Sequence, residues 1–340
     1  MATIRDVARA ANVSIATVSR VFNNNPLVTG ETAQRVLESA ASLDYWPNGA
    51  ARSLTTSLSH TFGVLLPDLF GEFYSEIIRG IDSVVHERHY QLLFSSSHAS
   101  GDEVLGAARA MLGRIDGLLM MVPDAASIET VERIRKRITV VLLNPSVAVP
   151  GCSSVSVDNY GGARLVTDHL LGLGHREVAM VAGPAGNRDA EERARGFRRA
   201  LVDAGLDPGT AQVVPGDFRE ASGYAAARRI LARRPRPTAV FAANDNMAIG
   251  LLSALREAGL QVPGDVAVAG FDNQTTTRYL NPPLTTVDVD TFALGREAVT
   301  LMLEYLDDED NGRPSVNRVL PASLTIRESC GASPAGRSMR

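Results

Sequence analysis

The first residues of the chain have the apolar and polar spacing of short capped helices. Thr3 stands at an N-cap position and Asp6 has the spacing of a capping box, so we expect a helix through Ala11. Ser14 stands at the next cap position, and the residues after it predict a second helix to about Phe22. Two helices joined by so short a turn form a helix-turn-helix pattern, whose second helix lies in the major groove of DNA.

A third helix is predicted after a loop. Thr29 stands at its N-cap. Four apolar residues recur at helical spacing and are expected to share one buried face: Val36, Leu37, Ala40 and Leu43. The following residues, 48–58, are small and polar, which is typical of a linker.

From Thr61 onward, short apolar runs alternate with amphipathic segments. The predicted strands are TFGVLL, YQLLFS, DGLLMM, TVVLLN, SVSVD, EVAMVAG, TAVFAA and DVAVAG. Continuous apolar strands separated by helices indicate parallel sheets covered on both faces. Polar residues stand at or just beyond several strand ends, where open α/β sheets bind ligands: Asp68, Asn144, Asp158, Asn244 and Asp272. Asp and Asn also start turns and cap helices, so each of these residues has two possible roles.

Length and composition indicate an ordinary globular protein of two or three domains. The chain has 340 residues, of which 45% are hydrophobic and 21% charged. It shows no signal-peptide pattern and no apolar run of the ~18 residues that span a bilayer, so we expect a cytoplasmic protein without a membrane segment. Cys152 and Cys330 have no metal-binding or redox spacing, and we expect neither a metal nor a cofactor.

The charge distribution gives only weak support for DNA binding. The net charge is −4. Residues 1–60 contain five arginines and four acidic residues, a net charge of +1, which leaves −5 for the rest of the chain. The difference has the sign expected of an N-terminal DNA-binding arm, but the prediction of DNA binding depends on the motif.

The second predicted helix carries candidate DNA contacts. Ile15, Ala16 and Arg20 are expected on its groove face. Arg20 can read guanine O6 and N7, whereas Ile15 and Ala16 offer apolar contact to thymine methyl groups. Thr17 and Ser19 can donate to phosphates. A small helical bundle without a DNA role is the alternative.

Enzyme functions have no support in the sequence. The chain contains no G-x-S-x-G, no H-E-x-x-H and no P-loop. Gly172 and Gly174 resemble half of a dinucleotide-binding fingerprint, but they precede a strand instead of following one.

The N-terminal segments TIRDVARAANVSIATVSRVFNN, ETAQRVLESAASLDYWPN and ARSL resemble the headpiece of the LacI/GalR family of bacterial repressors. The resemblance continues to about residue 327. It implies an all-α helix-turn-helix headpiece over residues 1–47 and a hinge helix or linker over 48–59. The DNA contacts that it implies, together with those argued above, are Ser14, Ile15, Ala16, Thr17, Ser19, Arg20, Asn23, Thr29, Thr32, Tyr45, Asn48, Ala51, Arg52 and Leu54.

In this family, paired hinge helices enter the minor groove and a leucine from each wedges into a central CG step. Leu54 matches that leucine, and the alternative is that it anchors the linker in a buried position. Apolar wedges of this kind kink DNA. Gly49 lies inside the expected hinge helix, where glycine costs roughly 1 kcal/mol relative to alanine. We therefore expect the hinge to be unfolded in the absence of DNA.

The resemblance also implies an α/β effector module over residues 60–335, similar to type I periplasmic binding proteins. Its two doubly wound parallel-sheet subdomains are expected over about 60–160 with 291–320, and 161–290 with 321–335, before a tail of 336–340. Seven residues match positions that contact the effector in the family: Phe73, Asn187, Asp189, Arg193, Phe218, Asn244 and Asp272. Phe73 and Phe218 are expected to form an aromatic clamp, while Arg193 and Asp272 bind polar groups.

The function that follows is sequence-specific transcriptional regulation, with repression as the expected mode. The expected partners are a second copy of the chain, a palindromic operator with a central CG, and a sugar or sugar derivative as effector. A nucleobase, nucleoside or other metabolite acting as corepressor is an alternative, as is a solute-binding module without a specific DNA role. A bacterial, cytoplasmic and nucleoid-associated location is expected.

Overall fold

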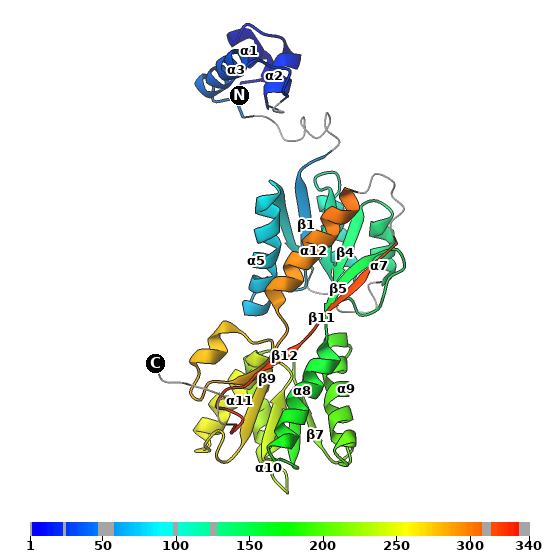
Figure 1. The fold of residues 1–340 in the computed structure, drawn as a ribbon, viewed down its shortest axis with the longest axis vertical. Coiled ribbons are helices and arrows are strands. Elements are labelled where there is room, and N and C mark those ends of the chain that lie inside the picture. Colours follow the sequence, from blue (N-terminus) through cyan, green and yellow to red (C-terminus); the bar gives the residue numbers. More distant parts are fainter. Residues whose placement is uncertain are drawn as a thin grey trace. The chain divides into compact units, whose positions relative to one another are not determined.

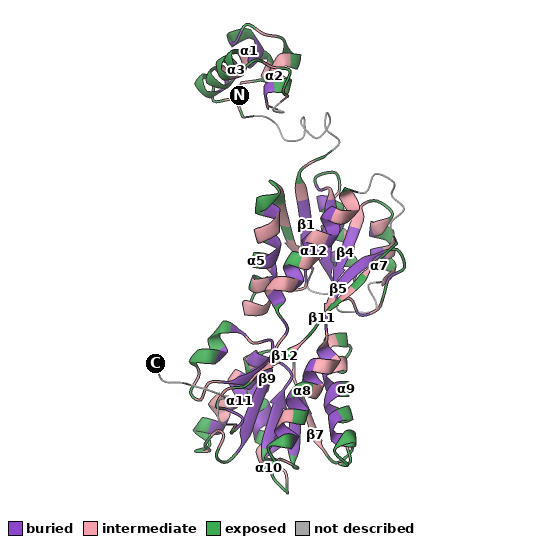
Figure 2. Cartoon of the chain, viewed as in Figure 1, coloured by how far each residue is buried: buried purple, intermediate pink, exposed green. Residues whose placement is uncertain are grey.

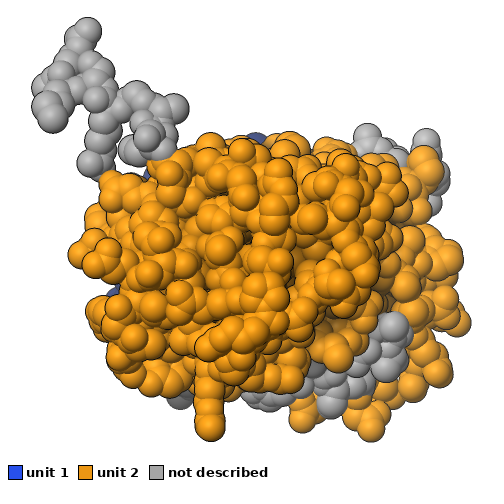
Figure 3. Space-filling view, turned by 90° about the horizontal axis from the view of Figure 1, so that it is seen from below, with its two compact units in different colours: residues 1–61, 113–116 blue, residues 62–112, 117–340 orange. Residues whose placement is uncertain are grey.

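The computed structural model describes residues 2–22, 25–46, 58–97, 101–122, 128–307 and 314–332. The chain divides into two compact units, Met1–Thr61 with Gly113–Asp116, and Phe62–Leu112 with Gly117–Arg340. Figure 3 colours the two units and shows one face of the second. Five predicted DNA-contacting residues lie outside the described residues: Asn23, Asn48, Ala51, Arg52 and Leu54.

The first unit contains three helices, α1 (Ile4–Ala10), α2 (Ile15–Phe22) and α3 (Gly30–Ser42). Each begins next to the predicted cap. The Asp6 carboxylate accepts hydrogen bonds from the Thr3 backbone N–H at 3.0 Å and the Thr3 hydroxyl at 2.7 Å. Ser14 Oγ accepts from the Thr17 N–H at 3.1 Å and Thr29 Oγ1 from the Thr32 N–H at 3.4 Å.

A small apolar core joins the three helices, and it differs from the prediction at two positions. Val36 and Ala40 are buried, but Leu37 is 51% exposed and Leu43 is 37% exposed. Leu37 lies about 100° around α3 from Val36, and Leu43 follows the last helical residue. The prediction of a buried face was therefore right for Val36 and Ala40 and wrong for the two leucines.

The second unit contains two six-stranded sheets, which we call the N-subdomain and C-subdomain sheets. The N-subdomain sheet has the order β11-β5-β4-β3-β1-β2. Its strands are β1 (Thr61–Leu66), β2 (Gln91–Ser96), β3 (Gly117–Met121), β4 (Thr139–Leu143), β5 (Ser153–Val157) and β11 (Asn317–Leu320).

The C-subdomain sheet has the order β12-β10-β9-β8-β6-β7. Its strands are β6 (Val178–Ala182), β7 (Gln212–Pro215), β8 (Ala239–Ala242), β9 (Ala267–Phe271), β10 (Thr285–Asp288) and β12 (Ser323–Thr325). Strand β12 pairs with β10 in antiparallel orientation, so this sheet has one antiparallel edge strand beside its parallel strands. The predicted fold class, a helical headpiece with two α/β subdomains, is confirmed.

Helices cover both sheets (Figure 1). The N-subdomain has α5 (Glu72–Glu87), α6 (Gly101–Met111), α7 (Ile128–Arg135) and α12 (Thr291–Leu306). The C-subdomain has α8 (Asn159–Gly172), α9 (Arg188–Asp203), α10 (Glu220–Ala232), α11 (Asp245–Glu257) and the 3₁₀ helix η2 (Thr275–Tyr279). The buried strands lie inside, and the helices turn exposed faces outward (Figure 2).

The chain passes between the two subdomains three times, between β5 and α8, between β10 and α12, and between β11 and β12. Within the N-subdomain, α5 and α12 lie side by side (Figure 1). A Cβ on Gly80 would stand 2.0 Å from the Phe292 carbonyl oxygen, so the two helices approach as closely as only glycine permits.

Candidate functional site

Helix α2 presents its predicted DNA-reading side chains to solvent. Ile15 is 45% exposed, and Ala16 and Arg20 are also exposed, whereas Val18 and Val21 are buried in the core of the first unit. An apolar face holds the helix in place, so its other face is available for a partner.

The remaining described candidates in the first unit have local contacts as well. The Ser14 and Thr17 hydroxyls lie 2.9 Å apart and share a hydrogen bond, and the Thr29 hydroxyl donates to Thr32 at 3.0 Å. The Tyr45 ring packs against Phe22, with centroids 5.9 Å apart. Ser19 is partly exposed.

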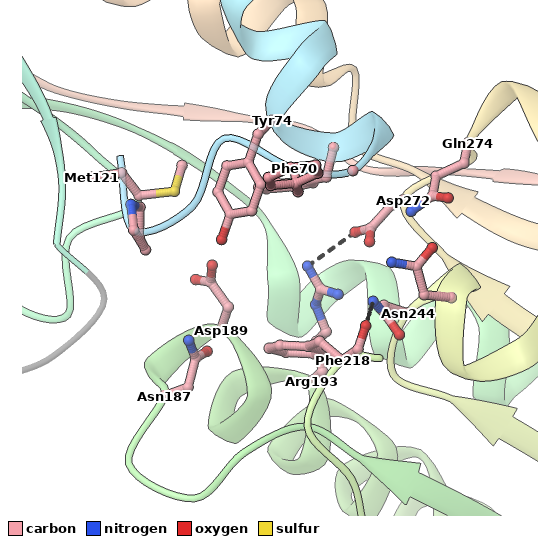
Figure 4. A pocket seen from close by; sticks show the side chains of 14 residues that line it. Phe70, Tyr74, Met121, Asn187, Asp189, Arg193, Phe218, Asn244, Asp272 and Gln274 are labelled. Carbon is pink, nitrogen blue, oxygen red and sulfur yellow. Dashed lines mark hydrogen bonds and ion pairs between the residues drawn. The ribbon is translucent and has the colours of Figure 1, made fainter. Parts of the chain in front are cut away.

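The second unit contains a cavity of about 120 Å³ that all seven predicted effector contacts line. That volume is several times what one water molecule needs. The structure adds residues that sequence reasoning missed: Pro67, Phe70, Gly71, Tyr74, Met121, Asn246 and Gln274. Figure 4 shows aromatic side chains at the upper and lower sides of this cavity and polar groups between them.

The cavity lies at the carboxyl ends of strands from both sheets, where α/β folds bind ligands. The N-subdomain contributes the loop after β1, the first turn of α5 and the end of β3. The C-subdomain contributes the start of α9, the loop before α10, and the residues after β8 and β9.

Arg193 and Asp272 occupy the centre of the polar lining. The Arg193 Nη2 and Asp272 Oδ1 atoms are 3.2 Å apart, and the two side chains are 3% and 5% exposed. Arg193 also donates to Asn159 Oδ1 at 2.8 Å and to the Ala243 carbonyl at 2.5 Å. Its guanidinium lies 3.8 Å from the Phe271 ring centre. The arginine is thereby fixed in direction before any ligand arrives.

Asp272 retains capacity for a ligand. It lines the cavity, and its carboxylate can accept several hydrogen bonds, whereas the described residues give it only the charged contact between Oδ1 and Arg193. Burial raises the pKa of Asp272 to about 6, with the positive charge of Arg193 acting in the opposite direction.

Asp189 forms a second polar centre. It accepts hydrogen bonds from Asn159 Nδ2 at 2.9 Å and Asn144 Nδ2 at 3.3 Å. Burial raises its pKa, against the opposing charge of Arg193. Figure 4 shows the Tyr74 hydroxyl directed toward Asp189. Burial, followed by nearby carboxylates, raises the pKa of Tyr74 to about 12, so this hydroxyl is a donor at neutral pH.

Two of the predicted contacts also stabilise local structure. Asn187 caps α9 by accepting from the Ala190 N–H at 3.0 Å. Asn244 caps α11 by accepting from the Met247 N–H at 3.0 Å, and its amide donates to the Phe218 carbonyl at 2.9 Å. Phe218 has φ +68°, a conformation that non-glycine residues rarely adopt, so Asn244 helps to hold a strained loop against the cavity.

The aromatic lining is larger than predicted. Phe73 lines the cavity and packs edge-on against Tyr74, with ring centroids 5.3 Å apart. Phe70 is 85% exposed at the opposite side of the cavity from Phe218 (Figure 4). The stretch PDLFGEFY after β1 contains three aromatic residues, and this density was the available signal for Phe70 and Tyr74.

Of the strand-end polar residues, Asn244 and Asp272 line the cavity and the other three have structural roles. Asp68 accepts from the Leu69 and Phe70 N–H groups, and Asp158 caps α8 through the Gly161 N–H at 2.7 Å. Asn144 orders the end of β5 by accepting from the Val157 N–H at 3.0 Å and reaches the cavity only through Asp189.

A helix-turn-helix unit joined to a two-subdomain module with a polar and aromatic cavity defines a class of protein, the ligand-responsive DNA-binding regulators. Residues 3–48 match the bacterial regulatory proteins of the lacI family, and residues 167–330 match the periplasmic binding protein-like domain. The chain belongs to the lacI family, which confirms the resemblance seen in the sequence.

Relatives match along almost the whole chain. The catabolite control protein A of Priestia megaterium is 34% identical over 330 residues, covering 96% of this chain and 98% of that protein. Among solved structures, the lac repressor dimer bound to operator and the anti-inducer ONPF has a TM-score of 0.87 at 31% identity, with 97% and 99% coverage. The complex of the transcriptional regulator CelR with cellobiose has a TM-score of 0.73 at 33% identity, with 97% and 100% coverage.

The chain is thus a DNA-binding transcriptional regulator of the lacI family and not an enzyme. Within the described ranges, no helix is long and apolar enough to cross a membrane. The same ranges contain no group of three or more His, Cys, Asp or Glu side chains that could hold a metal ion.

Proposed function

We propose that the chain is a cytoplasmic, homodimeric repressor that leaves its operator when an uncharged sugar or sugar derivative occupies the cavity of the second unit. The observation that carries this proposal is the buried Arg193–Asp272 pair in the lining of the cavity, whose carboxylate can accept further hydrogen bonds. A buried acceptor of this kind favours a ligand that brings hydroxyl donors.

The charge of the cavity lining supports an uncharged effector. Its ionisable side chains include two acids, Asp189 and Asp272, against one arginine, Arg193, which already faces Asp272. A phosphate or carboxylate ligand would meet net negative charge without a free cation in the lining. Hydroxyl groups can donate to the two aspartates and accept from Arg193 and the amide side chains of Asn187, Asn246 and Gln274.

The aromatic walls fit the same ligand class. Phe70 and Phe218 lie at opposite sides of the cavity and offer flat apolar surfaces to the C–H faces of a sugar ring. CelR, a structural relative, has been solved with cellobiose. A nucleobase would also stack on these rings, and the titration below separates the two classes.

For DNA binding, we propose that Ile15, Ala16 and Arg20 of α2 contact bases in the major groove and that Thr17 and Ser19 contact phosphates. The other proposed DNA contacts in the described part of the first unit are Ser14, Thr29, Thr32 and Tyr45. The exposure of Ile15, Ala16 and Arg20 supports this assignment. The lac repressor, a structural relative, has been solved as a dimer on its operator. A two-fold dimer requires symmetric half-sites, so the proposed operator is a palindrome, with a central CG for the hinge.

The test is selection of genomic fragments by the purified full-length protein, followed by sequencing. An enriched palindrome with a central CG is the expected result. Genes beside the bound fragments then nominate sugars for titration against the protein–operator complex, with nucleobases and nucleosides tested in parallel. Release by a neutral sugar supports the effector proposal. Release only by a nucleobase, or tighter binding with any ligand, contradicts it, and weak salt-sensitive binding without enrichment contradicts the DNA proposal.

A further inference from the structure

The carboxylate of Glu72 connects the two subdomains beside the effector cavity. Glu72, the first residue of α5 in the N-subdomain, accepts hydrogen bonds from η2 in the C-subdomain. Its Oε1 accepts from the Thr275 backbone N–H, and its Oε2 accepts from the Thr276 hydroxyl at 2.9 Å and the Thr276 N–H at 3.5 Å. We call these three contacts the Glu72 latch.

The latch stands directly beside the proposed effector site. Gly71 and Phe73, the neighbours of Glu72, line the effector cavity, and so does Gln274, which precedes Thr275. A second cavity of about 120 Å³ touches Glu72 and Thr275 and shares Phe73, Asp272 and Gln274 with the first. Any separation of α5 from η2 therefore changes the walls of the effector site.

The loop that the latch holds is itself rigid within the C-subdomain. Buried Asp245 accepts hydrogen bonds from the Gln274 N–H at 2.8 Å and the Thr286 hydroxyl at 2.6 Å. Asp272 and Asn273 have positive φ angles of 105° and 50°. Because this loop is fixed to its own sheet, a force on Thr275 is transmitted to the subdomain and is not absorbed locally.

The carboxylate is suited to this role because it is charged while its donors are neutral. Burial raises the pKa of Glu72, but the hydrogen bonds from Thr275 and Thr276 outweigh burial, and the pKa is lowered overall. Hydrogen bonds to a charged acceptor are stronger than those between neutral groups. Other polar contacts also join the subdomains, for example Arg188 donating to the Ser146 carbonyl at 2.8 Å, so the latch acts together with them.

We propose that Glu72 is a positioning residue that holds the two subdomains together across the effector site in the absence of effector. This inference rests on the proposed function. In the chain without effector, the latch favours the arrangement of the two subdomains that the structure shows. Removing it shifts the population toward a more open arrangement, which changes both the affinity for the effector and the fraction of chains competent for DNA.

Glu72→Gln in the full-length, effector-free protein tests the latch. Glu76→Gln is the matched control, because Glu76 lies one turn further along α5 and forms an ion pair with Arg79 of the same helix. Spin labels on cysteines at two exposed positions, Asp82→Cys on α5 and Ala221→Cys on α10, report the distance between subdomains. The native Cys152 and Cys330 are buried, and diluting labelled with unlabelled chain limits signals between protomers.

We expect the distance distribution to broaden toward longer separations in Glu72→Gln and to stay unchanged in Glu76→Gln. Thr276→Val, which removes only the hydroxyl donor, should give a smaller change in the same direction. Amide exchange of peptides covering η2 should rise about tenfold in Glu72→Gln. Faster exchange with an unchanged distance distribution would show a purely local bond and overturn the proposal.

Titration of the same variants with neutral sugars separates the two proposals. A Glu72→Gln chain that opens, in a protein that responds to no sugar, supports the latch and contradicts the sugar effector. A protein that responds to a sugar, with identical distances in Glu72→Gln and Glu76→Gln, overturns the latch and leaves the proposed function in place.

Discussion

Arg193 and Asp272 face each other at 3.2 Å in a cavity where neither side chain is more than 5% exposed. Burying two charges is costly unless their remaining hydrogen-bonding capacity is filled. Arg193 fills part of its capacity with Asn159 and Ala243 and rests on Phe271. Asp272 does not, because within the described part of the chain its carboxylate contacts only Arg193. The asymmetry identifies Asp272 as the group that gains most from a ligand.

Replacing Asp272 should therefore separate the effector response from DNA binding. Asp272→Asn keeps the shape of the side chain and removes its charge, so operator affinity should remain while effector-induced release is lost. Asp272→Ala should also lower the free energy of unfolding by about 3 kcal/mol, because the buried charge of Arg193 then loses its ion-pair partner. Operator titrations with and without effector, and urea unfolding, measure the two effects.

Asp102→Asn is the control for this change, since Asp102 is an exposed acid on α6. It should behave as the unchanged protein in both assays. A normal effector response in Asp272→Asn would remove Asp272 from the site.

The raised pKa of Asp272 predicts a pH dependence with a definite sign. Its folded-state pKa of about 6 is above the ordinary value of 3.8. The contribution of Asp272 to the free energy of unfolding is therefore present below about pH 4 and is lost as the pH rises through about 6. Effector affinity should change in the opposite direction, because ligand hydroxyls donate best to the ionised carboxylate. Calorimetric titration from pH 5 to 7.5 should show affinity rising through about pH 6.

The same titration with Asp272→Asn distinguishes this carboxylate from the others nearby. Burial also raises the pKa values of Asp189 and Asp245, so some pH dependence can persist in the variant. If the full dependence remained in Asp272→Asn, the titrating group would be another one.

The sequence predicted the parts of the fold that have continuous apolar patterns. All eight apolar runs contain strands, with ends that differ from the prediction by at most two residues. The strands without a prediction are β7, β10, β11 and β12. Strands β11 and β12 are short and only partly buried at sheet edges, and a pattern of burial cannot reveal a strand that is not buried. The antiparallel direction of β12 depends on tertiary pairing alone.

The cavity-lining residues that the family resemblance supplied were predicted correctly. Those whose place in the cavity depends on the three-dimensional path of the chain were missed. All seven predicted residues line one cavity, but the loop after β1 and the first turn of α5 were represented by Phe73 alone. Phe70 lies on a turn that Asp68 orders, and nothing in the sequence shows which ring that turn directs into the cavity. The Glu72 contacts join residues more than 200 positions apart, which no local pattern can reveal.

Gly80→Ala should destabilise the N-subdomain. The added Cβ would stand 2.0 Å from the Phe292 carbonyl oxygen, which is backbone and cannot rotate away, so α5 and α12 must move apart. Overpacking of this kind costs about 2 kcal/mol or more in free energy of unfolding. Urea unfolding measures the loss.

Gly106→Ala provides the comparison, because Gly106 lies in α6 with nothing within 4 Å of an added Cβ. There the same substitution should stabilise the protein by about 0.5–1 kcal/mol, since alanine favours helix more than glycine does. A gain of similar size in both variants would show that helix propensity, and not the α5–α12 contact, determines the outcome.

Arg20 is the residue of α2 that can discriminate a base pair by itself. It is exposed, and no ion pair involves its guanidinium within the described residues, so it is available to guanine O6 and N7. Arg20→Ala should weaken operator binding by about 1–3 kcal/mol and relax the preference at one guanine.

Four affinities measure the predicted loss of discrimination directly: those of the unchanged protein and of Arg20→Ala, each on the selected operator and on an operator with that guanine replaced. The unchanged protein should distinguish the two sequences and Arg20→Ala should not. A phosphate contact would instead weaken binding to both operators equally and reduce the salt dependence, because phosphates carry no sequence information. That result would leave direct base reading to the other exposed residues of α2, Ile15 and Ala16, whose apolar side chains can favour only thymine.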